Sequence, residues 1–457
     1  MKKMDRKMMW MLGLWMLCVA CEDKDLTPPD PEKGPEESVE VEPFDNIPSL
    51  SEMVVYEVNL RAFSASGNLD GVRQRLDHIQ SLGVNVLWLM PIYPIGIENG
   101  VNSPYAISDY KEVNPEFGTL NDLIKLVNEA HRRDMAVIMD WVGNHTAWDH
   151  LWMEHKDWYS QDAEGNIIAP PGTGWTDVAE LNFANQDMRD EMISDMTYWI
   201  HHAGIDGYRC DAVDFVPEDF WSEAIVAVDA STTKSLIWLA EGGIVENFQA
   251  GFAFNYGWDF YGKIKGIYSE DQSASGIFVT NEQEFNVVPD GKTKLRYITN
   301  HDLYAWDETP TEVYGEQGSV GAFVSTAFMA GVPLIYSGQE VANSELISFF
   351  GKNPINWSQN PEILSQYQSV MAARASVVDI LTGDLAIYGQ KDVIVFKHTK
   401  GTEEVLVVVN TRDKEVVLPV PAELQGTTWT NLLTESSRDI GSELVLSTKE
   451  YLILKTR

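Results

Sequence analysis

Eight short apolar segments recur along the first three quarters of the chain, and stretches with helical periodicity separate them. The segments cover 54–59, 85–91, 136–142, 207–212, 236–241, 252–258, 295–300 and 332–336. Several are apolar throughout instead of alternating, which is typical of parallel strands buried on both faces. Eight such strands with helical crossovers predict an α/β fold, a (β/α)8 TIM barrel.

A helix is predicted after the first of these segments. Its apolar residues recur about every 3.6 residues, at Leu69, Val72, Leu76, Ile79 and Leu82, and Gly83 ends it. Thr119 is placed to cap the next helix, ahead of an apolar stripe that begins at Leu120. A doubly wound open sheet is the alternative fold. No glycine-rich fingerprint follows the first strand, which disfavours a Rossmann-type nucleotide site.

The pattern changes after about residue 379, where helical periodicity stops. Short strand-like runs follow at 393–398, 405–410, 415–420, 428–432 and 444–454. They predict a C-terminal antiparallel β-sandwich over 379–457. The barrel is assigned to 50–378, with a small insertion subdomain, 145–179, after its third strand.

The first 20 residues are typical of a signal peptide, because a basic start precedes an apolar run too short to span a bilayer. A small residue before Cys21 resembles the bacterial lipoprotein cleavage site, at which this cysteine becomes lipidated. The acidic run after it resembles the export signal of Bacteroidetes lipoproteins. Residues 21–49, rich in proline and acids, are predicted to be a solvated tether. We expect a membrane-anchored lipoprotein at the outer membrane or cell surface; a periplasmic protein with an ordinary secretory signal is the alternative.

The charge of the chain restricts its partners. Lys and Arg total 33 against 69 Asp and Glu, a formal net charge of -36. Such a chain repels phosphate backbones and anionic lipid surfaces, so nucleic acid is not expected and a membrane is contacted only through the lipid at Cys21. Only Cys210 remains once the leader is removed and Cys21 is modified, so no internal disulfide is expected.

Polar residues close several of the apolar segments. Asp140, Asp211, Glu241 and Asp302 each stand at or just after a predicted strand. Active sites of barrel enzymes lie at the C-terminal ends of the strands. Each acid alone is more often a helix cap or a satisfied buried group. Four of them on one barrel rim indicate a site.

Two of these acids have surroundings that suit different chemical roles. Arg209 and Asp211 are two residues apart on one strand, so their side chains share a face, and the guanidinium favours the ionised carboxylate of a nucleophile. A structural ion pair is the other interpretation. Glu241 follows an apolar strand that disfavours its charged form, as a proton donor requires. Glycoside hydrolysis needs at least two such carboxyl groups. Asp302 adds a third acid, able to bind sugar hydroxyls or stabilise the cationic transition state.

Aromatic residues support a sugar ligand. Five of the 15 tryptophans lie at or just after the third segment: Trp141, Trp148, Trp152, Trp158 and Trp175. Aromatic faces bury the apolar faces of pyranose rings. Packing of a small subdomain explains each tryptophan equally well on its own.

Together these motifs resemble the α-amylase family, glycoside hydrolase family 13, over most of 51–375. The matching segments are 140–145 with Asn144 and His145, 207–211 with Arg209 and Asp211, Glu241, 300–302 with His301 and Asp302, 178–182, 103–110 with Tyr105, and 331–340. All occur in the family's order with spacing compatible with a barrel.

The resemblance implies a role for each site residue. Asp211 would be the nucleophile, Glu241 the acid and base, and Asp302 the stabiliser of the transition state. Tyr105, His145, Arg209 and His301 would bind the substrate. A retaining reaction is implied, with the two reacting carboxyl groups roughly 5–5.5 Å apart. No cofactor is needed for the chemistry.

The sequence also departs from the family pattern. Asp214 and Phe215 stand where many amylases have Lys and His, which leaves open the contacts to the leaving-group side of the substrate. Asn144 often binds a structural Ca²⁺ in amylases, and Glu180 is a candidate partner, so a calcium site is left open.

The predicted function is a retaining hydrolase that cleaves α-1,4-glucosidic bonds in starch or maltooligosaccharides. A neopullulanase, cyclomaltodextrinase, α-glucosidase or transglycosylase of the same family uses the same residues and stays an alternative. A non-catalytic starch-binding surface protein is disfavoured, because all three acids are present.

Overall fold

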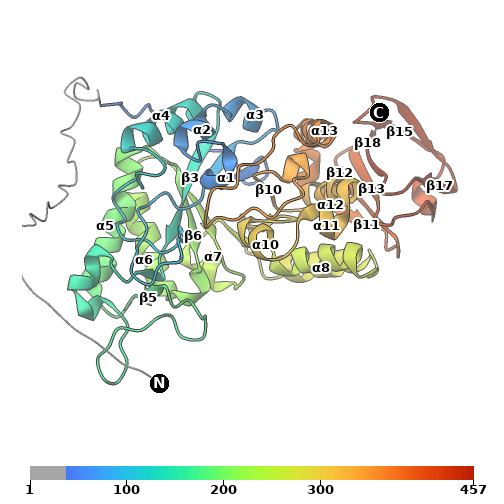
Figure 1. Ribbon diagram of the computed structural model, residues 1–457. Helices are drawn as coiled ribbons and strands as arrows, with labels where there is room; N and C mark the ends of the chain where they lie inside the picture. The colour runs from blue at the N-terminus through green and yellow to red at the C-terminus, as the bar shows by residue number, and fades with distance from the viewer. Residues whose placement is uncertain (1–37, 457) are drawn as a thin grey trace, which may run out of the picture. The chain divides into compact units, whose positions relative to one another are not determined.

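The computed structural model describes residues 38–456, so the predicted signal peptide, Cys21 and the acidic run behind it lie outside the described residues. Eight parallel strands close into a barrel in the order β1-β10-β9-β8-β7-β6-β3-β2 (Figure 1). Their bounds are β1 Val55–Val58, β2 Val86–Leu89, β3 Ala136–Val142, β6 Gly207–Asp211, β7 Ile237–Ala240, β8 Phe254–Tyr256, β9 Thr293–Arg296 and β10 Val332–Tyr336. The closed ring confirms the TIM barrel and excludes the open sheet.

Helices surround the ring of strands (Figure 1). They are α1 Leu60–Phe63, α2 Leu69–Arg73, α3 Leu76–Gln80, α4 Leu120–His131, α5 Gln186–His202, α6 Glu218–Ala230, α7 Glu246–Ala250, α8 Trp258–Ser269, α9 Gly276–Phe285, α10 His301–Trp306, α11 Pro310–Tyr314, α12 Glu316–Met329 and α13 Pro361–Val377. Thr119 caps α4 as predicted, in a capping box with Asp122. The prediction of one continuous helix after the first strand is wrong. The chain leaves helical geometry at Arg75 and forms two short helices, α2 and α3, instead.

One strand differs from its prediction. The ninth, β9, begins and ends earlier than the predicted 295–300. Its ladder with β10 stops where Arg296 pairs with Pro333, a residue without a backbone N–H to continue the pairing. The remaining residues, 297–300, form the loop that leads into α10 and carries Asn300 as its cap.

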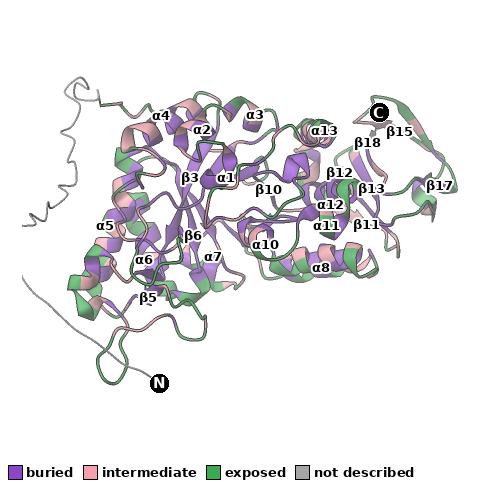
Figure 2. Ribbon diagram, viewed as in Figure 1, coloured by how far each residue is buried: buried purple, intermediate pink, exposed green. Residues whose placement is uncertain are grey.

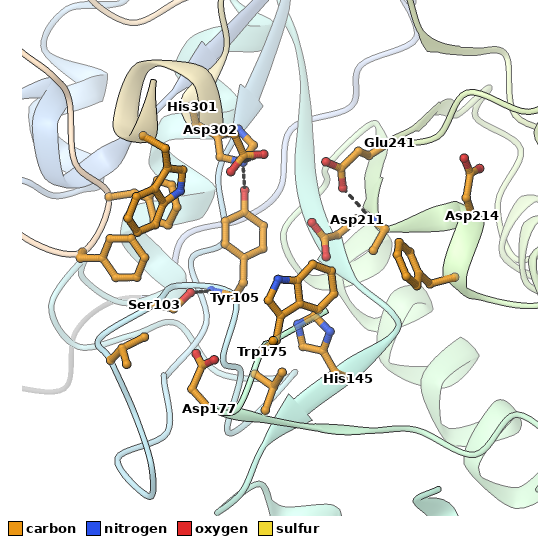
Figure 3. A pocket seen from close by; sticks show the side chains of 18 of the residues that line it. Ser103, Tyr105, His145, Trp175, Asp177, Asp211, Asp214, Glu241, His301 and Asp302 are labelled. Atoms are coloured by element: carbon orange, nitrogen blue, oxygen red, sulfur yellow. Dashed lines mark hydrogen bonds and ion pairs between the residues drawn. The ribbon is translucent and has the colours of Figure 1, made fainter. Parts of the chain in front are cut away.

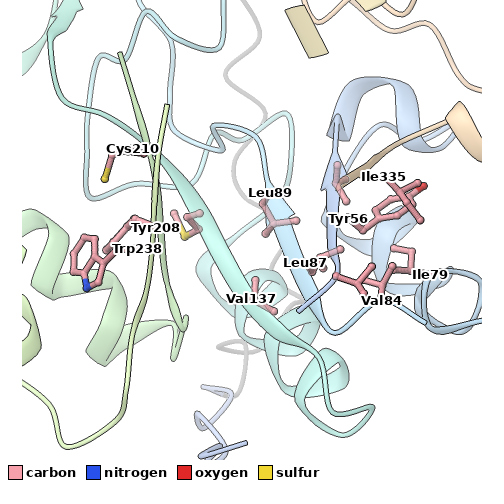
Figure 4. Packing of buried hydrophobic residues seen from close by; sticks show 14 of the residues in the cluster. Tyr56, Ile79, Val84, Leu87, Leu89, Val137, Tyr208, Cys210, Trp238 and Ile335 are labelled. Carbon is pink, nitrogen blue, oxygen red and sulfur yellow. The ribbon is translucent and has the colours of Figure 1, made fainter. Parts of the chain in front are cut away.

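The core has two layers, since successive strand residues face opposite sides. Outward-facing side chains such as Tyr56, Leu87 and Val137 pack against the helices (Figure 4). Inward-facing side chains, including Val55 and Leu334, fill the barrel. The strands are therefore buried on both faces (Figure 2), as their continuous apolar runs predicted.

Residues 39–48 pack against the barrel, so the predicted solvated tether is wrong for this part of 21–49. Phe44 joins the inward-facing apolar cluster and stacks on His131, with ring centroids 4.1 Å apart. The Glu42 N–H donates to Asn128, which in turn donates to the Glu40 carbonyl. Val41 fills the space beside Gly204, where a Cβ would meet it at 2.3 Å. A single aromatic residue, Phe44, gave little indication in the sequence that this segment would pack. Its burial nevertheless attaches the segment to the barrel.

The insertion after β3 is a small lobe. It is built on an antiparallel pair, β4 His145–Ala147 and β5 Val178–Glu180, with two single turns of 3-10 helix between them, Leu151–Glu154 and Lys156–Trp158. This pair places His145 at the barrel rim.

The C-terminal domain is antiparallel, as predicted. A six-stranded sheet has the order β11-β12-β13-β18-β15-β16, and β14 pairs with β17 in a separate ribbon. The bounds are β11 Asp384–Ile387, β12 Val393–Lys400, β13 Glu403–Asn410, β14 Val416–Pro419, β15 Thr427–Asn431, β16 Ser437–Ile440, β17 Glu443–Leu446 and β18 Tyr451–Thr456. The sequence did not indicate β11 and β16, of whose eight residues only Ile440 is buried, and the run 444–454 contains two strands.

Among residues 38–456, no helix combines the length and the apolar character needed to cross a membrane.

Candidate active site

A cavity opens at the C-terminal ends of the barrel strands, and three of the four acids singled out from the sequence line it (Figure 3), while Asp140 is fully buried and does not. Asp211 ends β6, Glu241 follows β7 directly, and Asp302 lies in the first turn of α10. Side chains that are far apart along the chain therefore share one space. The same cavity is lined by Tyr105, His145 and His301.

Arg209, which the family resemblance implied as a substrate-binding residue, lies buried beneath this cavity and does not line it. Its side chain is fully buried, and its Nη1 donates to Asp140 and to Asp211, both at 2.8 Å. Its Nη2 lies 3.0 Å from Glu241 Oε2, and the guanidinium carbon is 5.0 Å from the centre of the Trp88 ring. One cation thus pairs with three carboxylates, and because Arg209 is buried these interactions are screened less than they would be at the surface.

The local backbone explains how β6 delivers these groups. Gly207 begins the strand at φ +141, and a Cβ there would meet the Ile237 carbonyl oxygen at 2.0 Å, so only glycine allows this close approach to β7. Ala212, directly after Asp211, has a left-handed φ of 47. Non-glycine residues pay a steric penalty in this region, and such strain is concentrated at functional sites. The strained turn points the Ala212 N–H at Glu241 Oε2, 2.8 Å away.

The ionisation of Asp211 differs from the prediction. Burial raises the pKa of Asp211 to about 6, and the neighbouring Arg209 only partly offsets this. The sequence showed the arginine two residues away but not the depth of the carboxyl group in the protein. Desolvation outweighs the ion pair here.

Glu241 behaves as its apolar strand predicted. Burial raises the pKa of Glu241 to about 7, against the opposing effect of Arg209. The pKa values of both carboxyl groups therefore lie above their ordinary values. Because the two groups interact, their protons are lost one after the other, and the singly protonated pair has an ionised carboxylate beside a protonated one.

A second polar group forms the opposite wall of the cavity. His301 is buried, with Nδ1 paired to Glu57 and Nε2 2.8 Å from the Tyr105 hydroxyl oxygen. Burial alone would lower the pKa of His301, but Asp302 and Glu57 raise it to about 9. The ring is therefore an imidazolium that donates from both nitrogens. Tyr105 in turn donates to Asp140, at 3.3 Å, which links this wall to the Arg209 cluster.

His145 is a neutral counterpart to His301. Burial lowers the pKa of His145 to about 4, so the imidazole carries no charge near neutral pH. Its Nδ1 is 3.2 Å from Asn144 Nδ2, and its ring meets Trp175 at 5.4 Å between centroids. The ring can therefore hydrogen-bond a neutral hydroxyl group without attracting an anion.

Some of the five tryptophans at and after the third segment pack in the core, and one is placed to bind a sugar. Trp141 and Trp152 are buried in the core, and Trp148 and Trp158 pack against it. Of these five, only Trp175 lines the cavity.

The sequence did not indicate Glu57, which pairs with the cavity-lining His301 but does not line the cavity itself, or four aromatic residues that do line it: Trp258, Trp306, Phe349 and Phe350. Phe215, which the sequence marked only as a departure from the family pattern, lines the cavity as well. Glu57 is recognisable in the sequence as a single acid inside an apolar strand. The four aromatic residues come from α8, α10 and the segment after β10, so their spacing along the chain did not indicate a common site.

The residues considered for calcium lie together but do not fit that ion. Asn144 and Glu180 line one shallow surface pocket, and so does Arg189, which pairs with Asp219 at 2.8 Å and Glu223 at 2.7 Å. Calcium takes six to eight oxygen ligands. Residues 38–456 contain no group of three or more His, Cys, Asp or Glu arranged to hold a metal ion. The Arg189 guanidinium lies in the same pocket as the two candidate ligands, Asn144 and Glu180, and its positive charge opposes the binding of a second cation there.

Comparisons with known proteins agree with this geometry. The family model "Alpha amylase, catalytic domain" matches residues 42–166. "Alpha-amylase 3" of Dictyoglomus thermophilum is 26% identical over 370 residues, which cover 71% of this chain and 70% of that protein. The "Alpha-glucosidase" of Apis mellifera is 30% identical over 37% of this chain and 36% of its own length. The crystal structure of an α-amylase from Lactobacillus plantarum superimposes with a TM-score of 0.80 at 27% identity, covering 89% of this chain and 99% of that one.

Proposed function

We propose that the chain is a retaining glycoside hydrolase that cleaves α-1,4-glucosidic bonds of starch or maltooligosaccharides. The match of residues 42–166 to the α-amylase catalytic-domain model, the similarity to α-amylases and the (β/α)8 barrel support this proposal. One observation carries this proposal: Asp211 and Glu241 face a single cavity and share Arg209, and burial raises the pKa of both carboxyl groups. An ionised carboxylate beside a protonated one is what a two-step displacement at an anomeric carbon requires.

In the first step, the Asp211 carboxylate attacks the anomeric carbon and forms an ester bond to it. The bond to the leaving glycosidic oxygen breaks, and Glu241 gives that oxygen its proton. In the second step, a water molecule attacks the same carbon while Glu241 accepts its proton and the ester bond breaks. Asp211 returns to a carboxylate, and two inversions give retention. Both groups are side chains, so the reaction needs no cofactor.

The remaining residues bind the sugar at the cleavage point. Tyr105 offers a ring face to the pyranose, and its hydroxyl is fixed by His301. Asp302, whose side chain is 45% exposed, is free to accept hydrogen bonds from sugar hydroxyls and to face the positive charge of the transition state. His145 adds a neutral hydrogen-bonding group, and Arg209 keeps Asp211 in position.

The stereochemistry of the product tests this function. We expect the first-formed sugar, followed by proton NMR before mutarotation, to be the α-anomer. Appearance of the β-anomer first would contradict the double displacement. Product analysis on starch, pullulan, cyclodextrin and maltotriose then separates the amylase from an α-glucosidase, neopullulanase, cyclomaltodextrinase or transglycosylase. Binding of starch without any turnover would support a non-catalytic surface protein.

We also propose that the protein is exported and anchored by a lipid on Cys21. The support is the basic and apolar start of the chain and the small residue before that cysteine. Metabolic labelling with an alkyne fatty acid should mark the wild-type protein and not Cys21→Ser. Equal labelling of both would contradict the anchor, and protease treatment of intact cells would separate the cell surface from the periplasm.

A further inference from the structure

A second cavity lies at the end of the barrel opposite the active site. It has a volume of about 510 Å³ and opens where β9, β10 and β1 begin, three strands that are neighbours in the barrel. The C-terminal ends of α12 and α13 complete its walls, and both helices stand beside the C-terminal domain (Figure 1). None of the residues placed in the proposed reaction lines this base cavity, so a ligand bound here would serve a purpose other than hydrolysis.

The side chains of the base cavity carry the opposite sign of charge to the chain as a whole. Arg374 and Lys292 line it, whereas no Asp or Glu among residues 38–456 does. The chain has 69 acidic against 33 basic residues, so a wall whose charged side chains are cations alone departs from the general composition. A concave surface lined by one sign of charge concentrates ions of the other sign. The base cavity therefore attracts anions.

Arg374 is the buried cation of this cavity. Only 4% of the residue is exposed, and its Nε and Nη2 donate to the backbone carbonyl oxygens of Ala327, at 2.9 Å, and Ser51, at 3.3 Å. In the part of the chain that the structure describes, its Nη1 has no hydrogen-bond partner and its guanidinium forms no ion pair. Burial lowers the pKa of Arg374 to about 10, so the group stays charged near neutral pH. A buried cation without a counter-ion is unfavourable, and an anion at Nη1 would offset this.

Lys292 is the second cation, and it also forms no ion pair within residues 38–456. Its Nζ donates to the Gly251 carbonyl oxygen at 3.0 Å. Burial lowers the pKa of Lys292, and the charge of Asp229 opposes this only in part. Asp229 does not line the cavity, and its carboxylate accepts a hydrogen bond from Trp238 Nε1 at 3.0 Å. An anion in the base cavity would thus meet two cations that have no paired acid.

The rest of the wall determines which kind of anion fits. Leu50, Phe285 and Leu381 line the cavity with apolar side chains. An inorganic anion gains nothing from such a wall, whereas an aliphatic chain leaves water when it packs there. A carboxylate matches the planar donor fork of a guanidinium. Small-molecule sites typically have volumes of about 300–1,000 Å³, and the base cavity falls within that range.

We propose that the base cavity binds the carboxylate of a small aliphatic acid. The guanidinium of Arg374 and the ammonium of Lys292 hold the carboxylate, and the apolar walls cover the hydrocarbon chain. The binding is non-covalent, and it goes beyond the proposed hydrolase without depending on it. Ser51, Lys292 and Arg374 come from the segments before β1 and β9 and from α13, so the ligand joins three parts of the chain and stabilises the folded protein by mass action.

Four probes separate the charge from the hydrocarbon chain. Hexanoate has both, 1-hexanol lacks the charge, acetate lacks the chain, and inorganic phosphate is an anion without an apolar part. We expect hexanoate to bind the full-length protein in titration calorimetry and to raise its melting temperature. The dissociation constants of the other three should be about tenfold larger or more, because each loses the ion pair or the apolar contact. Equal binding of hexanoate and any of the other three, or no binding of hexanoate, would overturn the proposal.

Two variants test whether the ligand lies in this cavity. Arg374→Met and Lys292→Met each remove one charge and keep an unbranched side chain, so each should weaken hexanoate binding about tenfold. Arg438→Met removes a guanidinium from β16, outside the cavity, and should bind hexanoate as the wild type does. Unchanged affinity in Arg374→Met or Lys292→Met would overturn the proposal, and if neither variant folds, the four probes on the wild-type protein still decide. Because the measured quantity is affinity, a protein that does not hydrolyse starch would contradict the proposed function and leave this test intact.

Discussion

The two ends of the barrel handle buried charge in different ways. At the base, where the strands begin, Asp206 is fully buried and its carboxylate receives the Val137 N–H at 2.6 Å, His131 Nε2 at 2.8 Å and the ammonium of Lys234. At the mouth, Asp140, Asp211 and Glu241 share the single guanidinium of Arg209. The base matches one acid with several donors, while the mouth matches several acids with one cation.

This difference separates stability from chemistry. A buried carboxylate with several hydrogen-bond donors strengthens the fold. The carboxylates at the mouth hold their protons more tightly, because burial raises the pKa values of Asp211 and Glu241 and the single guanidinium offsets this only in part. Changes at the base should therefore reduce stability and leave turnover intact, and changes at the mouth should do the reverse.

Asp211→Asn should have the largest effect. An amide cannot form the ester intermediate, so we expect kcat on starch to fall by about 10⁴-fold or more. The melting temperature should stay the same or rise, because one of the competing carboxylates is gone. Reducing-sugar assays and calorimetry on the same preparation measure both. Activity close to wild type would remove Asp211 from the mechanism.

Asp206→Ala tests the buried charge at the base of the barrel. The change leaves the buried His131 and the half-buried Lys234 without their acid, and breaking a buried pair costs about 3–5 kcal/mol of unfolding free energy. Chemical denaturation measures that loss. The protein that remains folded should keep its kcat/KM within about twofold of wild type, because the site lies at the other end of the strands. A large loss of turnover in fully folded protein would show that the two ends are coupled.

Phe44→Ala tests the contribution of residues 39–48, which pack against the barrel. The side chain is 9% exposed, and removing it leaves a hole beside His131 and the inward-facing cluster. We expect a loss of about 2–4 kcal/mol in unfolding free energy, with normal turnover. Phe44→Leu should recover part of this loss. If Phe44→Ala is as stable as wild type, residues 39–48 do not contribute to the barrel as their packing indicates.

The pH dependence of activity tests the carboxyl groups at the mouth of the barrel, and its expected effect is the smallest of these predictions. Asp211 must be ionised, so kcat/KM should fall as the pH drops below about 6. Glu241 must be protonated, so it should fall again as the pH rises above about 7. Outside this window the decline is about tenfold per pH unit.

A fluoride substrate sharpens this prediction. Fluoride leaves without a proton from Glu241, so the alkaline decline in kcat/KM should disappear with α-maltosyl fluoride while the acid decline persists. An alkaline decline that is the same for both substrates would assign it to a group other than Glu241.

The sequence predicted the fold and the acids well because both follow from local pattern. A continuous apolar run indicates a strand buried on both faces, and an acid at its end falls on the barrel rim. The remaining features depend on contacts between distant segments. The burial that raises the pKa of Asp211, the pairing of Glu57 with His301 and the meeting of Phe215 with Trp175 all arise only when the loops come together. Phe44 lies in a proline-rich acidic stretch whose composition indicated a solvated tether. Residues 39–48 instead pack against the barrel, because the Phe44 ring is buried in the inward-facing apolar cluster.

The covalent intermediate is the most direct test of the whole account. A 5-fluoro-α-glucosyl fluoride slows the second step, and mass spectrometry of proteolytic peptides then locates the attached sugar. We predict one added glycosyl group on the peptide that contains residues 207–212, attached to Asp211 and absent from Asp211→Asn. A sugar attached to another residue, or turnover with no covalent adduct and a β-anomeric product, would contradict the central claim.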